Sequence, residues 1–301
     1  MDQKKNEQIQ KFGGAWTVIK IDILKQYLDA YTTALKSQPF NLVYIDAFAG
    51  CGKYTTKNDQ QDMPLLAIKK DTDIEVREGS ARAALNITNP FHKYHFIDLA
   101  ESNFEQLNSL KAEYSSISSR ISIHREDANE AVLRICKETN WYDYRGVLFL
   151  DPFDLEVEWK TIETVAQTKG IDMWFLFPIM AVNRLLTRKE LPPEEWQKKL
   201  DKVFGATDWR TSLYSKIQAR QTSIYSLLPE DITVKDTDIE GIKEYTASRL
   251  RTVFTKVSPS ARILRNKTNS PLFVLFFAVS TESDRGKEVA MRIANYILKN
   301  T

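Results

Sequence analysis

Residues 46–52, Asp-Ala-Phe-Ala-Gly-Cys-Gly, constrain the possible fold more than any other part of the chain. They directly follow an apolar run, residues 42–45, whose length and composition are typical of a buried strand. An acid at a strand end followed by a Gly-x-Gly turn brings bare backbone close to a ligand, because glycine lacks the Cβ that would block the approach. The next four residues, 53–56, provide neither the Lys-Ser/Thr of a phosphate-binding loop nor a third glycine at G-x-G-x-x-G spacing.

Further apolar runs of strand length follow in the chain, at residues 94–97, 121–124, 146–150 and 173–178. Asp98, Asp127 and Asp151 stand at or just after the ends of the first three runs. In an open parallel sheet, ligands bind beyond the carboxyl ends of the strands. We therefore expect these acids and Asp46 to lie along one edge of a parallel sheet.

Helical spacing of apolar residues between the strands predicts crossover helices. The expected helices cover residues 16–35, 81–87, 104–114, 128–139, 159–168 and 288–298. Ser80 is expected to be the N-cap of the second helix, and the polar residues 53–78 predict a loop with little structure of its own. Residues 181–258 show mostly helical patterns and no clean strand, whereas residues 262–265 and 271–280 predict two strands joined by a polar turn.

The composition is that of a soluble globular protein without a covalent or metal scaffold. The chain has 301 residues, of which 43% are hydrophobic, and its two cysteines, Cys51 and Cys136, suggest no disulfide framework and a reducing, cytoplasmic location. The three histidines are expected in core or surface positions, so no metal site is predicted. The charged N-terminus and the short apolar stretches predict neither a signal peptide nor a membrane span.

Positive charge gathers in the C-terminal part of the chain. Residues 180–301 contain 21 Lys and Arg against 14 Asp and Glu, although the net charge of the whole chain is only +2. No acid falls between Glu244 and Glu282, but six basic residues do: Arg249, Arg251, Lys256, Arg262, Arg265 and Lys267. This basic stretch suits a face that contacts nucleic-acid phosphates, but the sequence alone slightly favours a solvated helix-and-hairpin surface.

The order of these motifs resembles that of class I S-adenosylmethionine-dependent methyltransferases, in which D-x-F-x-G-x-G is the first motif. The resemblance implies an α/β fold with a Rossmann-like, doubly wound sheet of seven strands, the last of them antiparallel. An N-terminal helix would precede the sheet, and a helical insertion would interrupt it. The implied segments are an N-terminal helical part (1–38), a methyltransferase-like domain (39–180 and 259–301) and a helical insertion that faces substrate or partner (181–258).

The resemblance implies S-adenosylmethionine as the cofactor and assigns residues to its parts. Gly50 and Gly52 suit the close approach of its amino acid moiety, Asp98 suits the ribose hydroxyls, and Asp127 with the backbone amide of Ala128 suits the adenine. Each of the two aspartates accepts hydrogen bonds in these roles.

Other residues near these motifs bear on the same pocket. Asp46 and Phe48 belong to the first motif and are expected to line it. Glu101 competes with Asp98 for the ribose, and Asp127 also suits the N-cap of the helix that follows it.

Asp151-Pro152-Phe153 is where we expect the reacting amine to bind. The exocyclic amine of a base is a poor nucleophile because its lone pair is delocalised, and acceptors for its two N–H groups favour the pyramidal nitrogen of the transition state. Asp151 provides a carboxylate, Pro152 a carbonyl held in place by its fixed φ, and Phe153 a ring for stacking. Amino-methyltransferases more often carry D/N-P-P-Y/F, while D-P-F resembles tRNA guanine N2-methyltransferases. A strand end turned by proline is the purely structural alternative.

A closer resemblance is to the three-Cys-motif partner protein family, TcmP. It is carried by residues 11–17, 44–50, 78–81, 149–153, 177–178 and 183–184, and it weakens over residues 190–258. Membership would imply a methyltransferase-like fold and a genetic partner with a three-cysteine motif, but no known substrate.

Three functions fit the sequence to different degrees. The leading hypothesis is an S-adenosylmethionine-dependent N-methyltransferase acting on a nucleic-acid base or a base-like amine. The alternative is a non-catalytic S-adenosylmethionine-binding partner subunit of a three-Cys-motif, radical-type protein. A nuclease or nucleotide-handling enzyme is disfavoured because the acids are spread one per strand instead of being paired at metal-ligand spacing.

Overall fold

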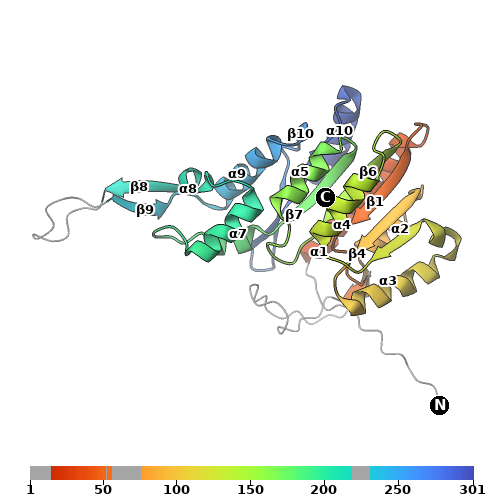
Figure 1. The fold of residues 1–301 in the computed structure, drawn as a ribbon, viewed down its shortest axis with the longest axis horizontal. Helices are drawn as coiled ribbons and strands as arrows, with labels where there is room; N and C mark the ends of the chain where they lie inside the picture. The colour runs from red at the N-terminus through yellow and green to blue at the C-terminus, as the bar shows by residue number, and fades with distance from the viewer. Residues whose placement is uncertain (1–14, 52, 56–75, 219–230) are drawn as a thin grey trace, which may run out of the picture.

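One mixed sheet of eight strands, in the order β10-β12-β7-β6-β1-β4-β5 with β11 also paired to β12, forms the centre of the molecule (Figure 1). The computed structural model describes residues 15–51, 53–55, 76–218 and 231–301. The parallel strands are β1 (Asn41–Asp46), β4 (Lys93–Ile97), β5 (Ile121–His124), β6 (Tyr144–Leu150) and β7 (Ile171–Phe177).

Strand β12 (Pro271–Val279) runs antiparallel beside β7 and completes the sheet. Two short strands, β10 (Lys256–Val257) and β11 (Arg262–Arg265), pair in succession with its outer side, and both are antiparallel to it. When β10 and β11 are counted as one position, the sheet has seven positions. Numbered by their order in the chain and read from β5 to β10, these positions are 3-2-1-4-5-7-6. The predicted Rossmann-like sheet with an antiparallel last strand is therefore confirmed.

Helices cover both faces of the sheet and make a three-layer sandwich (Figure 1). One face carries α1 (Ala15–Leu35), α2 (Ser80–Leu85), α3 (Glu101–Glu113) and α10 (Asp284–Asn300). The other carries α4 (Ala128–Glu138), α5 (Trp159–Gln167), α6 (Ile179–Leu185), α7 (Glu194–Phe204) and α9 (Ile239–Arg251). Within the described ranges, no helix has the length and apolarity needed to cross a membrane.

Strand β1 shows why the central strands are apolar throughout. Successive side chains of a strand point to opposite faces, so Val43 and Ile45 pack toward α4 and α5 while Leu42 and Tyr44 pack toward α1 and α2. Because both faces of a parallel sheet are covered by helices, neither set can be polar.

The insertion between β7 and β10 differs from the sequence prediction, which was mostly helical and had no clean strand. Besides α6, α7, α9 and the short α8 (Trp209–Ser212), it contains an antiparallel hairpin of β8 (Tyr214–Gln218) and β9 (Asp231–Lys235) that projects from the body of the molecule (Figure 1). Apolar and polar residues alternate in β9, Ile-Thr-Val-Lys after Asp231, so a period-two signal was present.

Ser80 does not cap α2 as the sequence predicted. The N-cap of this helix is Gly79, without a side-chain hydrogen bond, and Ser80 is buried as the first helical residue. The loop predicted for residues 53–78 begins and ends in a two-stranded sheet of β2 (Lys53–Thr55) and β3 (Val76–Glu78), while residues 56–75 lie outside the described residues.

Helix α1 is joined to the sheet by a buried polar contact as well as by apolar packing. The Tyr27 hydroxyl donates a 2.6 Å hydrogen bond to Oδ2 of Asp172 on β7, and the Tyr27 ring lies 5.3 Å from that of Trp174. Burial raises the pKa of Asp172 to about 7, although the Tyr27 hydrogen bond and Arg145 act in the opposite direction. At neutral pH, Asp172 therefore still carries its proton in a substantial share of the folded molecules, whereas an aspartate of the unfolded chain is ionised.

We predict that Asp172 makes the protein less stable as pH rises from about 4 to about 7. Folded protein binds the proton more tightly than unfolded protein, so each pH unit between the two pKa values removes about 1.4 kcal/mol from the free energy of unfolding. Asp172→Asn keeps an oxygen for the Tyr27 hydroxyl but cannot ionise, so urea unfolding of this variant should depend less on pH than that of wild type. Asp236→Asn, at an exposed position, is the control. Equal pH dependence in wild type and Asp172→Asn would contradict the prediction.

Candidate functional site

Residues 47–50, which follow β1, are hydrogen-bonded to the carboxyl ends of the two strands that flank β1, namely β4 and β6. The Ala47 amide donates to the Phe149 carbonyl at 3.1 Å, and the Ala49 amide donates to the Ile97 carbonyl at 2.9 Å. The chain then turns at Gly50, whose φ of 58° is in the left-handed region that favours glycine. Gly52 lies outside the described residues, so its predicted contact with a cofactor stays a prediction.

Asp98 anchors this glycine turn. Its Oδ2 accepts a 3.0 Å hydrogen bond from the Gly50 amide, and its Oδ1 accepts a 2.8 Å hydrogen bond from the Ala100 amide. Each carboxylate oxygen has a further lone pair, so Asp98 can still accept from a ligand hydroxyl. Its competitor Glu101 forms a 3.1 Å ion pair with Arg125 at the surface. The structure therefore gives Asp98 a positioning role that the sequence did not predict.

Asp46 is fully buried at the end of β1. Its Oδ2 accepts a hydrogen bond from the Tyr44 hydroxyl at 3.2 Å, and its Oδ1 has no hydrogen-bond partner in the described part of the chain. Burial and the charge of nearby Asp151 raise the pKa of Asp46 to about 7, and the neighbouring Ser80 and Tyr44 hydroxyls oppose this rise. Asp46 and Asp151 thus form a pair of adjacent acids at the end of β1 and β6.

Asp151 is engaged by a residue that the sequence reasoning missed. Lys20 of α1 forms an ion pair with Asp151 Oδ2, and only 8% and 16% of the two side chains are exposed. The Lys20 ammonium also lies 5.0 Å from the centre of the Trp16 ring. The position of Lys20 carried a signal, because it falls in phase with the buried residues Leu24, Tyr27 and Tyr31 of the same helix. A lysine in that stripe needs a buried acid as its partner.

The segment after Asp151 places an aromatic ring at the surface. Pro152 is buried, whereas 44% of Phe153 is exposed and its amide donates a 2.9 Å hydrogen bond to Glu156 Oε2. Asn129, whose role the sequence did not suggest, ties the segment to α4. Its side chain donates to the Glu156 carbonyl at 2.9 Å and accepts from the Glu158 amide at 3.0 Å.

The remaining predicted residues lie beside this edge in mainly structural contacts. Asp127 caps α4, because its Oδ1 accepts from the amides of Asn129 and Glu130 at 2.8 and 3.1 Å. Ala128 and Phe48 are partly buried and pack against the core on the side of α4 and α5. The structural alternative for Asp127 is thus confirmed, and its adenine role stays a prediction.

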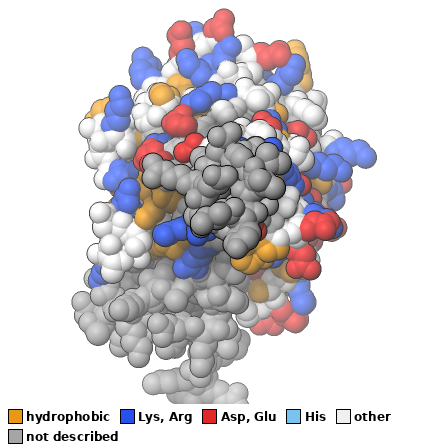
Figure 2. Space-filling view, turned by 90° about the vertical axis from the view of Figure 1, so that its left-hand side faces the viewer, with side chains coloured by type: hydrophobic (Ala, Val, Ile, Leu, Met, Phe, Trp, Pro, Cys, Tyr) orange, Lys and Arg blue, Asp and Glu red, His pale blue; other side chains and the backbone are white. Residues whose placement is uncertain are grey.

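The basic stretch does not form one surface. Lys256 pairs with Val279 near the amino end of β7, whereas Arg265 lies opposite Pro271, beyond the carboxyl end of β7. Arg249 donates to the Phe204 carbonyl at 3.0 Å, so part of this charge holds the fold together. On the face from which the hairpin projects, Figure 2 shows Lys and Arg interspersed with Asp and Glu.

Comparisons with known proteins concern the fold alone. No protein-family model matches the chain, and no curated protein matches it. Among solved structures, protein LPL1258 of Legionella pneumophila, of family DUF519, is similar with a TM-score of 0.44 and 11% identity, over 92% of this chain and 91% of that one. Spermidine synthase of Thermotoga maritima has a TM-score of 0.39 and 11% identity, over 89% and 61% of the chains.

A third similar structure is the magnesium protoporphyrin IX methyltransferase of Synechocystis, solved with bound S-adenosylmethionine. Its TM-score is 0.32 and its identity is 12%, over 77% of this chain and 89% of that one. None of these matches shows membership of the TcmP family, which therefore stays a prediction. The fold assignment rests on the strand order itself.

We predict that Lys20 and Asp151 are energetically coupled. Removing one member of a buried ion pair leaves a buried charge without a partner, which costs about 3–5 kcal/mol. Urea unfolding of Lys20→Met and of Asp151→Asn should show large losses, and the double variant should be much more stable than the sum of those losses allows. Lys36→Met, at an exposed position just after α1, is the control. Additive losses in the double variant would show that the pair is not coupled.

Proposed function

We propose that the protein binds S-adenosylmethionine at the carboxyl edge of β1, β4 and β6 and transfers its methyl group to an amine nitrogen. The acceptor in this proposal is a nucleic-acid base or a base-like amine. The observation that carries the proposal is the meeting of Gly50, Asp98, Asp46 and Asp151 at one edge of a sheet with methyltransferase topology. When bound, the cofactor supplies an electrophilic methyl group on a sulfonium.

Two features of this edge fit an amino acid moiety with an ammonium group. Gly50 turns at positive φ and presents backbone without a Cβ. Asp46 Oδ1 is buried and lacks a donor among the described residues, and a buried acceptor of this kind is costly unless a donor reaches it. Asp98, already fixed by the Gly50 and Ala100 amides, is the acceptor best placed for ribose hydroxyls.

Asp151 is the group that we assign to the acceptor amine. Lys20 offsets the charge of its carboxylate and contacts Oδ2, so Oδ1 can accept an N–H of the amine. That hydrogen bond strengthens as the nitrogen becomes pyramidal, which lowers the barrier to transfer more than it stabilises the bound substrate. The exposed Phe153 ring, next to the buried Pro152, suits stacking of a base.

We predict that Asp98 is needed for cofactor affinity. Asp98→Ala removes an acceptor for the ribose and the anchor of the Gly50 amide together, and hydrogen bonds to a charged group contribute about 1.5–3 kcal/mol each. Calorimetric titration with S-adenosylmethionine and S-adenosylhomocysteine should show this loss, while Glu101→Ala should bind as wild type does. A normal affinity in Asp98→Ala with a loss in Glu101→Ala would move the ribose role to Glu101. The absence of any binding to wild type would overturn the proposed cofactor.

We predict that Asp151→Ala binds the cofactor but transfers no methyl group. Because this change leaves Lys20 buried without a partner, Lys20→Met/Asp151→Ala is tested beside it to keep the fold intact. Transfer from radiolabelled S-adenosylmethionine to total nucleic acid and to cell protein measures activity, with Glu105→Ala, at an exposed acid, as the control. Full activity in either Asp151 variant would refute the assigned role.

A non-catalytic subunit is the second candidate, and one observation favours it. Asp151 is held by Lys20 in a mostly buried ion pair, as an acid with a purely structural role would be. In this alternative the chain binds S-adenosylmethionine and serves a three-Cys-motif protein, as the TcmP resemblance implies. Wild type that binds the cofactor and methylates no nucleic acid, protein or small amine would favour this alternative.

A further inference from the structure

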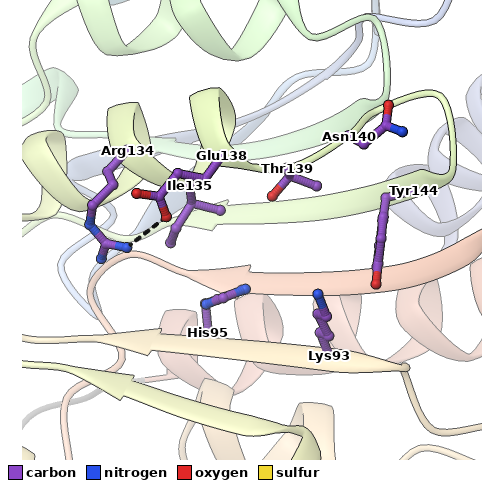
Figure 3. Close-up of a pocket in the computed structure, with 8 residues that line it drawn as sticks. All are labelled: Lys93, His95, Arg134, Ile135, Glu138, Thr139, Asn140 and Tyr144. Atoms are coloured by element: carbon purple, nitrogen blue, oxygen red, sulfur yellow. Dashed lines mark hydrogen bonds and ion pairs between the residues drawn. The ribbon is translucent and has the colours of Figure 1, made fainter.

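A second polar site lies at the opposite end of the strands from the candidate cofactor site. A cavity of about 380 Å³ opens under the end of α4, beside the first residues of β4 and β6. Figure 3 shows Lys93, His95 and Tyr144 turned toward this space, with Arg134, Glu138 and Thr139 along its other side.

Hydrogen bonds determine which histidine nitrogens carry protons here. Arg134 Nη2 lies 3.3 Å from His124 Nδ1, and an arginine can only donate, so we assign this nitrogen as an acceptor; Glu126 Oε1 lies farther from it, at 3.4 Å. The single proton of neutral His124 is therefore on Nε2, which lies 2.9 Å from His95 Nδ1 and donates to it. His95 in turn carries its proton on Nε2, the nitrogen that faces away from His124. This relay makes His95 a donor toward the cavity, where its side chain points in Figure 3.

Two bases, Lys93 and Arg134, and two acids, Glu126 and Glu138, surround the cavity, and both acids contact Arg134, which leaves Lys93 without an acid as a partner in the described part of the chain. Arg134 is engaged by Glu126, and it also forms a 3.3 Å ion pair with Glu138. Lys93 has no acid as a partner among the described residues, and its ammonium lies 4.6 Å from the centre of the Tyr144 ring. An ammonium and an imidazole N–H therefore point into one space, and the Thr139 hydroxyl lines it as well.

We propose that this cavity binds the phosphate group of a small molecule. The Lys93 ammonium, the His95 N–H and the Thr139 hydroxyl match the several acceptor oxygens of a phosphate, and charge-assisted hydrogen bonds are the strong ones. The volume is at the lower end of that of small-molecule sites, which suits a phosphorylated metabolite better than a macromolecule. This proposal does not rest on the function proposed above, because Lys93 and Tyr144 stand at the amino ends of β4 and β6, whereas Asp98 and Asp151 follow the carboxyl ends of these strands.

Binding of an anion here should be linked to protonation of His95. Burial, followed in order of effect by His124, Lys93 and Arg134, lowers the pKa of His95 to about 4. His95 is paired with His124 on β5. The other titratable or charged groups around this pair are Lys93 on β4, Glu126 after β5, Arg134 and Glu138 on α4, and Tyr144 on β6. A bound phosphate adds negative charge beside His95 and must raise its pKa. By linkage, the affinity for a phosphate of given charge should rise as pH falls toward the pKa of His95.

The test uses inorganic phosphate as the probe and the full chain as the protein. Calorimetric titration at constant ionic strength should show binding to wild type that chloride does not reproduce. Lys93→Met should bind about tenfold more weakly, equivalent to ~1.4 kcal/mol. Lys137→Met, an equal change of charge on the exposed side of α4, should bind like wild type. No phosphate binding in wild type, or equal affinities in wild type and Lys93→Met, would overturn the proposal.

A second measurement needs no substitution in the site. The His95 imidazole is followed by NMR across a pH titration, with and without phosphate. We expect its pKa to rise when phosphate is present, while the pKa of His92, outside the cavity, stays unchanged. An unchanged pKa of His95 at phosphate concentrations that saturate the calorimetric signal would place the bound ion elsewhere and overturn the proposal.

Discussion

The packing of α1 against the sheet is the constraint on which the rest of the structure depends. This helix covers the aromatic face of β1, β6 and β7, and it also reaches two buried acids, Asp151 through Lys20 and Asp172 through Tyr27. A buried acid needs a partner, because desolvation of its charged form is costly. The N-terminal helix is thus a part of the candidate active site as much as a part of the core.

Two buried or partly buried ionisable groups along the parallel strands, Asp46 and His95, each lie close to a charge of the sign that they would carry themselves. Acids gather at the carboxyl ends, where Asp46 and Asp151 are close enough for one charge to raise the pKa of the other acid. Nearer the amino end of β4, burial and then His124, Lys93 and Arg134 lower the pKa of His95. In each case a buried group is kept nearer its neutral form, and a ligand of the opposite charge would relieve the strain between like charges.

Much of the core architecture was predictable because its signals are local. The apolar runs, the acids that follow them and the glycine turn at Gly50 each depend on a few consecutive residues. The hairpin of β8 and β9 was missed because its alternation is short and lies among helical patterns. Ser80 was misassigned as a cap because a serine before a helix suits an N-cap, whereas its burial beside Asp46 comes from tertiary packing.

The sequence by itself determined the order of strands and helices and the edge at which four acids would appear. A strand that is apolar on both faces must lie inside a parallel sheet, and the carboxyl ends of parallel strands must share an edge. Only the tertiary structure decided what each acid contacts. Lys20 meets Asp151 from 131 residues away, and the relay from Arg134 to His95 joins three separate elements. Such contacts depend on the distances between packed layers, which no local pattern of residues records.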